Sequence, residues 1–257
     1  MSAVALAYSY EAVPQSSFSD RVSQLLDRID YRLIESHEDR EAIARLRYDA
    51  YLREGAISPN PSKTFADPYD DKNNVWIFGL YIDGELASSI RIHVASKDNP
   101  VFPSLAVFSD LLEPELAAGN TIIDPTRFVT DPRLSRLYPG LPYVTLRLCW
   151  LAAERFAAEH FLVAVRAEHQ AFYRRVFRHR SICGPRTYPL LSKPITLMTV
   201  NYKDVAAQVH RRYPFFRSTF FERRMLFERY RPVLPTAIPL RPVLHGNPPP
   251  PVASHAG

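Results

Sequence analysis

The chain has 257 residues, 46% of them hydrophobic and 12% aromatic, so it can bury a large core and is expected to be globular. Its formal net charge is +5, and its two cysteines lie 34 positions apart, which argues against a disulfide framework or a zinc site. No stretch approaches the roughly 18 uninterrupted apolar residues of a membrane-spanning helix, and the N-terminus lacks the basic and apolar regions of a signal peptide. We therefore expect a cytoplasmic protein without a metal site.

The pattern of the N-terminal half predicts a helix, a strand and a second helix, followed by a long loop and a β-hairpin. Hydrophobic residues recur at helical spacing in both helices, and Asp83-Gly84 is typical of a hairpin turn. The expected bounds are a helix over 18–29, a strand over 30–36, a helix over 37–54, a loop over 56–73, and strands over 74–82 and 85–94.

The second half continues with alternating strands and helices, after a stretch at 104–116 that is helix or loop. The expected elements are a strand over 120–130, a helix over 143–159, a strand over 161–165, a helix over 169–177, a strand over 195–202, and helical segments over 205–229. The predicted divisions are an N-terminal segment over 1–29, a central domain over 30–204, a helical extension over 205–231 and a Pro-rich, disordered tail over 232–257.

The strand at 120–130 contains Asp124 and Arg127 within an otherwise apolar and β-branched stretch. Pro125 lies between them and removes a backbone donor, so we expect the strand to bulge or end there. An irregular strand end re-aims side chains and frees backbone N–H groups, which suits a functional site. Alternatively, the two charges form a structural ion pair, since buried charges are usually paired.

The charge is distributed unevenly along the chain. Residues 133–257 carry 20 Lys and Arg against 6 Asp and Glu, whereas residues 1–132 carry 12 basic and 21 acidic residues. A basic C-terminal half predicts a polyanionic partner, which is nucleic acid, a phospholipid surface or an acidic carrier protein. Alternatively, the individual arginines only solvate helix faces.

The order of elements resembles the Gcn5-related acyltransferase fold, which implies an α/β protein with a central mixed, twisted sheet flanked by helices, here with an extra C-terminal helical segment. The segment FLVAVRAEHQAFYRRVF resembles the fifth strand and fourth helix of that superfamily, and Tyr173 takes the place of a tyrosine that protonates the departing thiolate. Alternatively, Tyr173 packs in the core. The glycine-rich loop that cradles coenzyme A is replaced at 133–143 by RLSRLYPGLPY, which argues against a standard acetyl-coenzyme A enzyme.

Residues 31–203 also resemble the acyl-homoserine-lactone synthases and their relatives, the N-acyl amino acid synthases. The segments LRYDAYL, FADPYDD, SIRIHV and IDPTRF carry this resemblance. It implies that the substrate-binding residues are Arg47, Tyr51, Asp67, Asp70, Arg91, Arg127 and Phe128. The lactone synthases carry a tryptophan after the first helix, which is absent between Tyr51 and Trp76, and a glutamate where Asp124 stands. Both departures argue against S-adenosylmethionine as the amine donor and favour an N-acyl amino acid synthase.

The resemblance therefore implies an enzyme that transfers a long-chain acyl group from acyl carrier protein to the α-amine of an amino acid. We predict that Asp124 accepts a proton from the amine, directly or through water, with Asp67 or Asp70 as further candidates. Arg127 or Arg91 would bind the substrate carboxylate, and backbone N–H groups at 128–130 would stabilise the oxyanion. An alternative role for the loop carboxylates and Arg47 is an ion-pair network that holds the loop.

Acyl carrier protein is acidic, so the basic half has a natural partner. The predicted docking residues are Arg174, Arg175, Arg178 and Arg180. Further arginines at 211–224 are consistent with peripheral contact to lipid head groups at the inner membrane surface. We expect no tightly bound cofactor, because the acyl group arrives on phosphopantetheine. The alternatives are an acyl-homoserine-lactone synthase, an acetyl-coenzyme A-dependent N-acetyltransferase and, more remotely, a non-catalytic protein that binds nucleic acid.

Overall fold

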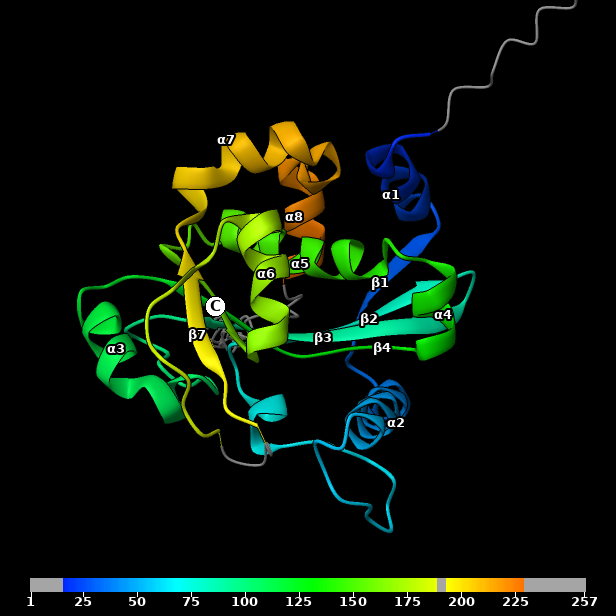
Figure 1. The fold of residues 1–257 in the computed structure, drawn as a ribbon, viewed down its shortest axis with the longest axis horizontal. Coiled ribbons are helices and arrows are strands. Elements are labelled where there is room, and N and C mark those ends of the chain that lie inside the picture. The colour runs from blue at the N-terminus through cyan, green and yellow to red at the C-terminus, as the bar shows by residue number, and fades with distance from the viewer. Residues whose placement is uncertain (1–15, 189–192, 229–257) are drawn as a thin grey trace, which may run out of the picture. The chain divides into compact units, whose positions relative to one another are not determined.

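The computed structural model describes residues 16–188 and 193–228, and in this part of the chain seven strands form one mixed sheet (Figure 1). The strands are β1 Ile29–Leu33, β2 Val75–Ile82, β3 Glu85–Ala95, β4 Ile122–Thr130, β5 His160–Val165, β6 Arg180–Ser181 and β7 Thr196–Val200. Their order across the sheet is β1-β2-β3-β4-β5-β7-β6. Neighbouring strands are antiparallel except β4 and β5, which are parallel.

Helices cover both faces of the sheet. The α-helices are α1 Phe18–Leu26, α2 His37–Arg53, α3 Leu105–Ala117, α4 Pro132–Leu137, α5 Leu141–Arg155, α6 Ala167–Phe177, α7 Tyr202–Arg212 and α8 Phe220–Phe227. Two short 3₁₀ helices, η1 Pro68–Asp71 and η2 Pro214–Phe216, complete the described elements. In Figure 1, α2 and α3 lie on one side of the sheet, and α1, α5, α6, α7 and α8 lie on the other.

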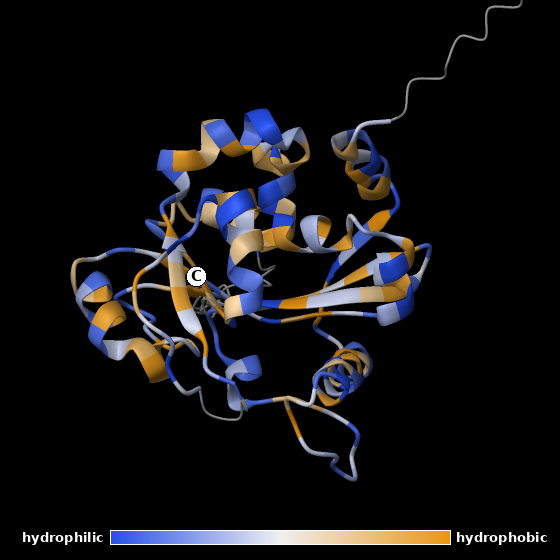
Figure 2. Ribbon diagram, in the orientation of Figure 1, coloured by the Kyte–Doolittle hydropathy of each residue, from blue (hydrophilic) through white to orange (hydrophobic). Residues whose placement is uncertain are grey.

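The hydrophobic core lies between the sheet and the helices on each of its two faces. Helix α5 contacts β3 and β4 and is buried over most of its length, and Trp150 at its centre packs against Phe177 and Tyr202. On the opposite face, Phe108 and Leu112 of α3 pack with β4, β5 and β7. Figure 2 shows both hydrophobic and hydrophilic stretches along the helices, as expected for helices with one buried side.

The structure confirms the predicted α/β class and its central mixed sheet flanked by helices. The expected C-terminal helical segment exists as α7 and α8, which both contact α5. The predicted tail at 232–257 lies outside the described residues. None of the described helices is long and apolar enough to cross a membrane.

Three local predictions need correction. The stretch after β4 is not a plain loop, because Asp131 caps α4 by accepting hydrogen bonds from the backbone N–H groups of Arg133 and Leu134, and Pro132 occupies the first turn. The loop at 56–73 contains η1, and the two-residue strand β6 was not expected. These elements are too short to show a helical or strand period in the sequence.

Strand β4 bulges, as predicted, and then separates from β5. Its pairing with β3 shifts register between Thr126 and Val129, and Arg127 has a positive φ of 55°. The parallel pairing of β4 with β5 covers only Ile122 and Ile123 on the β4 side. The sheet is therefore open between the later parts of these two strands.

Candidate active site

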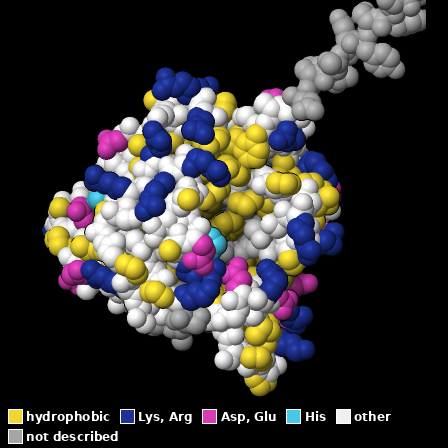
Figure 3. Space-filling model, viewed as in Figure 1, with side chains coloured by type: hydrophobic (Ala, Val, Ile, Leu, Met, Phe, Trp, Pro, Cys, Tyr) yellow, Lys and Arg dark blue, Asp and Glu magenta, His cyan; other side chains and the backbone are white. Residues whose placement is uncertain are grey.

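A cavity of about 470 Å³ lies where β4 and β5 separate. Residues 125–130 of β4 line one side, and residues 163–165 of β5 with the beginning of α6 line the other. The C-terminal end of α2 and the first turns of α5 complete the lining. Figure 3 shows hydrophobic side chains gathered in a hollow near the centre of this face, with basic side chains around it.

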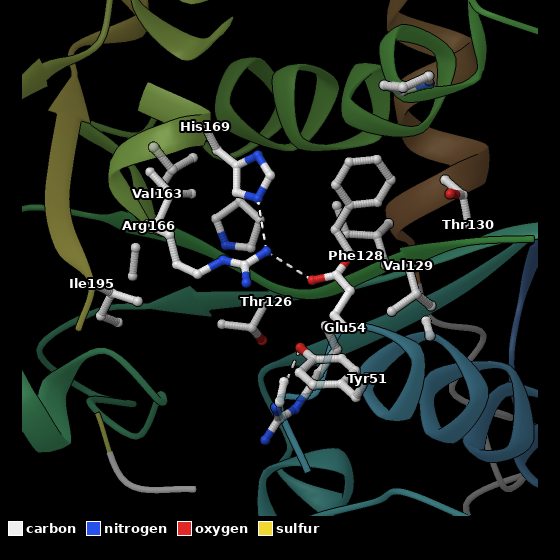
Figure 4. Close-up of a pocket in the computed structure, with 18 of the residues that line it drawn as sticks. Tyr51, Glu54, Thr126, Phe128, Val129, Thr130, Val163, Arg166, His169 and Ile195 are labelled. Carbon is white, nitrogen blue, oxygen red and sulfur yellow. Dashed lines mark hydrogen bonds and ion pairs between the residues drawn. The ribbon is translucent and has the colours of Figure 1, made fainter. Parts of the chain in front are cut away.

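The lining has an apolar part and a polar part. The apolar part comes mainly from α5, α6 and the strand walls, and includes Ile90, Phe128, Val129, Pro142, Leu146, Val163, Phe172 and Ile195. The polar part comes from the end of α2, from β4, from the β5–α6 junction and from the segment before β7, and includes Tyr51, Arg53, Glu54, Thr126, Arg127, Arg166, His169 and Lys193. Figure 4 shows members of both sets around the same space. The cavity can thus hold a molecule that is apolar at one end and polar at the other.

Beside the cavity, two of the three carboxylates of the FADPYDD loop, those of Asp67 and Asp70, meet the predicted arginines. The Asp67 carboxylate accepts from Arg91 Nη1 at 2.5 Å, and from Arg127 at 3.0 Å (Nε) and 2.5 Å (Nη2). Asp70 accepts from Arg91 Nη1 at 2.8 Å and from Arg47 Nη1 at 2.7 Å. The sequence prediction that these five residues lie together is therefore correct in geometry.

The loop adopts this position because η1 presents the carboxylates. Asp67 caps η1 by accepting a hydrogen bond from the backbone N–H of Tyr69, and Asp70 occupies the third position of the same capping box. The neighbouring Arg91 and Arg127 guanidinium groups hold the pKa of Asp67 well below its usual range, although burial acts in the opposite direction. All three arginines of this network are buried, so the ion pairs of Arg91 and Arg127 fix the loop to the sheet and that of Arg47 fixes it to α2.

Only one member of this network reaches the cavity. Arg127 lines it, whereas Arg47, Arg91, Asp67 and Asp70 do not. This arrangement matches the alternative role, a network that holds the loop. The predicted role of these residues in binding substrate is not tested by the contacts and stays a prediction.

Asp124 is fully buried and does not line the cavity. Its two carboxylate oxygens accept hydrogen bonds from the backbone N–H and the hydroxyl of Ser104, at 3.0 and 2.7 Å. Burial raises its pKa to about 6, and the two hydrogen bonds from Ser104 oppose that rise. The structure thus pairs Asp124 with the start of α3 and not with Arg127, so the proposed ion pair between them is wrong. Its catalytic role stays a prediction.

The predicted aromatic residues do lie at the cavity. Tyr173 of α6 lines it and is 8% exposed, and burial raises the pKa of its phenol, so the hydroxyl stays protonated. Tyr51 lines it as well and accepts a long hydrogen bond of 3.4 Å from Arg127, whose guanidinium also lies 5.4 Å from the Tyr51 ring centre. Phe128 belongs to the apolar wall.

The predicted docking arginines lie outside the cavity lining, at the end of α6 and in β6. Arg174, Arg175, Arg178 and Arg180 are all exposed. Arg174 donates to Gln170 and Ser181, and Arg178 donates to Gln208. Within residues 16–188 and 193–228, no group of three His, Cys, Asp or Glu side chains is placed to hold a metal ion.

Among the polar lining residues that sequence reasoning missed, three contact one another. Glu54 caps the C-terminal end of α2, Arg166 follows β5, and His169 lies in the first turn of α6. Arg166 donates to Glu54 Oε2 at 2.8 Å and to His169 Nε2 at 3.1 Å, as the dashed lines in Figure 4 show. The available signal was the position of Arg166 directly after a wholly apolar strand, where a strand end meets a helix start.

Comparison with solved structures shows where this fold occurs. The chain is similar to FeeM, an N-acyl amino acid synthase from uncultured soil microbes, with a TM-score of 0.60 and 16% identity over 73% of this chain and 98% of that one. It is also similar to the AHL synthase LasI, with a TM-score of 0.50 and 14% identity over 66% of this chain and 87% of that one. The chain is likewise similar to TofI, solved in a ternary complex with an inhibitor and MTA, with a TM-score of 0.50 and 13% identity over 70% of this chain and 95% of that one.

These similarities, with the opened sheet and its cavity, define the Gcn5-related acyltransferase fold. The chain belongs to the N-acyl amino acid synthase FeeM family, whose model matches residues 42–201. It is therefore an acyltransferase, as the sequence predicted. A comparison with curated protein sequences finds no match.

Proposed function

We propose that the chain transfers a long-chain acyl group from acyl carrier protein to the α-amine of an amino acid. The observation that carries the proposal is the cavity between β4 and β5, which joins an apolar wall to a group of charged side chains. An acyl thioester needs the first environment and an amino acid needs the second. Membership of the N-acyl amino acid synthase family supports this choice of product.

The start of α5 supports a carrier-bound acyl donor. This helix begins with Leu141 and Pro142 after a single glycine, Gly140, and Pro142 has no backbone N–H to offer. Several glycine N–H groups at a helix start would be needed to bind a free pyrophosphate well. The exposed arginines at the end of α6 provide an alternative anchor, because they suit the acidic surface of a carrier protein.

The reaction forms an amide bond and breaks a thioester. The substrate ammonium loses a proton, and the free amine attacks the thioester carbonyl. The attacking nitrogen then loses a second proton, and the oxyanion collapses with departure of the thiolate, which takes up one proton. Backbone N–H groups at the β4 bulge, at 128–130, are the proposed oxyanion donors, and Tyr173 is the proposed donor of a proton to the thiolate. Asp124 would accept the amine proton only through a relay, because its carboxylate lies outside the cavity lining.

The test supplies purified protein with palmitoyl-acyl carrier protein and the twenty amino acids separately, and detects products by mass spectrometry. We expect an N-acyl amino acid whose formation depends on the carrier-bound donor. An acyl-homoserine lactone formed from S-adenosylmethionine, or an acetylated amine formed from acetyl-coenzyme A, with no N-acyl amino acid, would refute the proposal. Tight binding to DNA without any acylated product would refute it as well.

A further inference from the structure

An ion pair joins two elements that line the same cavity from different sides. Glu54 follows the last turn of α2, and Arg166 immediately precedes α6. Their side chains meet at 2.8 Å, and both line the cavity (Figure 4). Arg166 also donates to His169 Nε2 at 3.1 Å and lies 3.2 Å from Glu168 Oε1. The pair therefore places a guanidinium and a carboxylate at the polar part of the cavity.

The fold does not depend strongly on this pair. The Glu54 side chain is 53% exposed, and an ion pair with such an exposed member typically contributes about 0–1 kcal/mol. A ligand can thus separate Glu54 from Arg166 at little cost. By contrast, Arg127 gives two N–H groups to the buried carboxylate of Asp67, so it is already committed to the loop network.

Arg166 differs from the other cations in the lining. Its side chain is 21% exposed, whereas Arg53 and Lys193 are exposed to solvent. A partly desolvated guanidinium binds a carboxylate more strongly than a fully hydrated one, and its planar shape allows two parallel hydrogen bonds. Among the described residues that line the cavity, Glu54 is the only carboxylate. It is thus the natural acceptor for an ammonium group there.

We propose that Glu54 and Arg166 form the site that recognises the zwitterionic head group of the amino acid, an assignment that rests on the proposed function. Arg166 binds the substrate carboxylate, and Glu54 binds the substrate ammonium. In the free enzyme Glu54 and Arg166 pair with each other. When the amino acid binds, its carboxylate takes the place of Glu54 beside Arg166, and its ammonium takes the place of Arg166 beside Glu54. His169 is a positioning residue, because its Nε2 accepts a hydrogen bond from Arg166 and so orients the guanidinium.

The test compares two acceptors: the amino acid with the highest kcat/KM and the amine that lacks its carboxylate. Wild-type enzyme should prefer the amino acid, and Arg166→Gln should lower that preference by roughly 10- to 100-fold, mainly through KM. Arg166→Lys should restore part of it. Glu54→Gln should raise KM for both acceptors by similar factors and leave the preference unchanged, since both acceptors carry the ammonium.

A matched control is Arg45→Gln, which breaks an exposed ion pair with Glu41 on the same helix α2 but away from the cavity lining. It should leave both acceptors unaffected, and circular dichroism with thermal melting should show that all variants are folded. If Arg166→Gln keeps the wild-type preference, the assignment is overturned while the proposed function stands. If wild-type enzyme acylates no amino acid, the proposed function itself fails and this assignment fails with it.

Discussion

Replacement of Asp124 by asparagine should change how the stability of the protein depends on pH. The Asp124 carboxylate is fully buried and accepts two hydrogen bonds from Ser104. An asparagine side chain fits the same geometry, because its oxygen can accept from the Ser104 N–H while its NH₂ donates to the hydroxyl. The substitution therefore removes the buried charge and keeps both contacts.

The magnitude follows from the pKa of Asp124. Burial raises it from an ordinary value of 3.8 to about 6 in the folded protein. Between pH 3.8 and pH 6 the folded state therefore binds more protons than the unfolded state. The contribution of Asp124 to the free energy of unfolding is fully present below pH 3.8 and is lost as the pH rises through 6. A difference of about two pKa units corresponds to about 3 kcal/mol in the free energy of unfolding. Asparagine does not titrate, so the variant does not lose this stability.

Urea unfolding of wild-type protein and Asp124→Asn between pH 4 and pH 7.5 measures the effect. The stability of the variant relative to wild type should increase by about 2 kcal/mol over this range, because part of the full change already occurs below pH 4. Asp83→Asn is the control. Asp83 is exposed, and Arg28 lowers its pKa, so its contribution to stability grows as the pH rises, opposite to that of Asp124. Parallel stability curves for wild type and Asp124→Asn would refute the reasoning. Acylation at pH 7.5 in the same variant tests the predicted catalytic role, since a folded but inactive protein supports it and full activity contradicts it.

Other predictions concern the loop network, the proton donor and the docking surface. Asp67→Asn should destabilise the fold by about 3–5 kcal/mol in urea unfolding, because it leaves the buried Arg127 guanidinium without a counter-charge and removes one of the two carboxylates beside Arg91. The exposed Asp83→Asn should have little effect, and equal costs would contradict this account. Tyr173→Phe should lower kcat by roughly 100-fold with little change in Tm, and an unchanged kcat would leave Tyr173 a packing residue. Arg175→Glu combined with Arg178→Glu should raise KM for acyl carrier protein several-fold at low salt and much less at high salt, while KM for the amino acid stays constant.

Most of the fold is predictable from the hydrophobic pattern and the turn residues. Helix α2 has buried positions at helical spacing, helix α5 is a long and mostly apolar stretch, and the apolar runs of β2 and β5 are short and bounded by polar residues. Helix α4 has only six residues, so it shows no such repeat, and its signal was the capping residue Asp131 followed by proline. Short elements are therefore predicted from the capping residues and prolines at their ends and not from a hydrophobic repeat.

The contacts at the candidate site were also only partly predictable from the sequence. Charged residues within apolar strands or a capped loop are unusual enough to be noticed, and physical chemistry requires that they be paired, so the meeting of Asp67 with Arg91 was predictable. Glu54 and Arg166 lie at element ends, where charged residues are common, and although Arg166 directly follows an apolar strand, nothing local indicates that it pairs with Glu54. Their proximity arises only because β4 and β5 separate, which is a property of the whole sheet.

The bulge in β4 explains how one strand serves both the network and the cavity. In a regular strand, consecutive side chains point to opposite faces, so Thr126 and Arg127 would be directed apart. In the structure both side chains contact the loop network, because Thr126 accepts from Arg91 Nε at 2.9 Å and Arg127 donates to Asp67. The positive φ of Arg127 and the register shift beside it make this possible, at a local conformational cost that the buried ion pairs offset. The loop network therefore holds β4 in the bulged form, and the bulged form gives the cavity its wall.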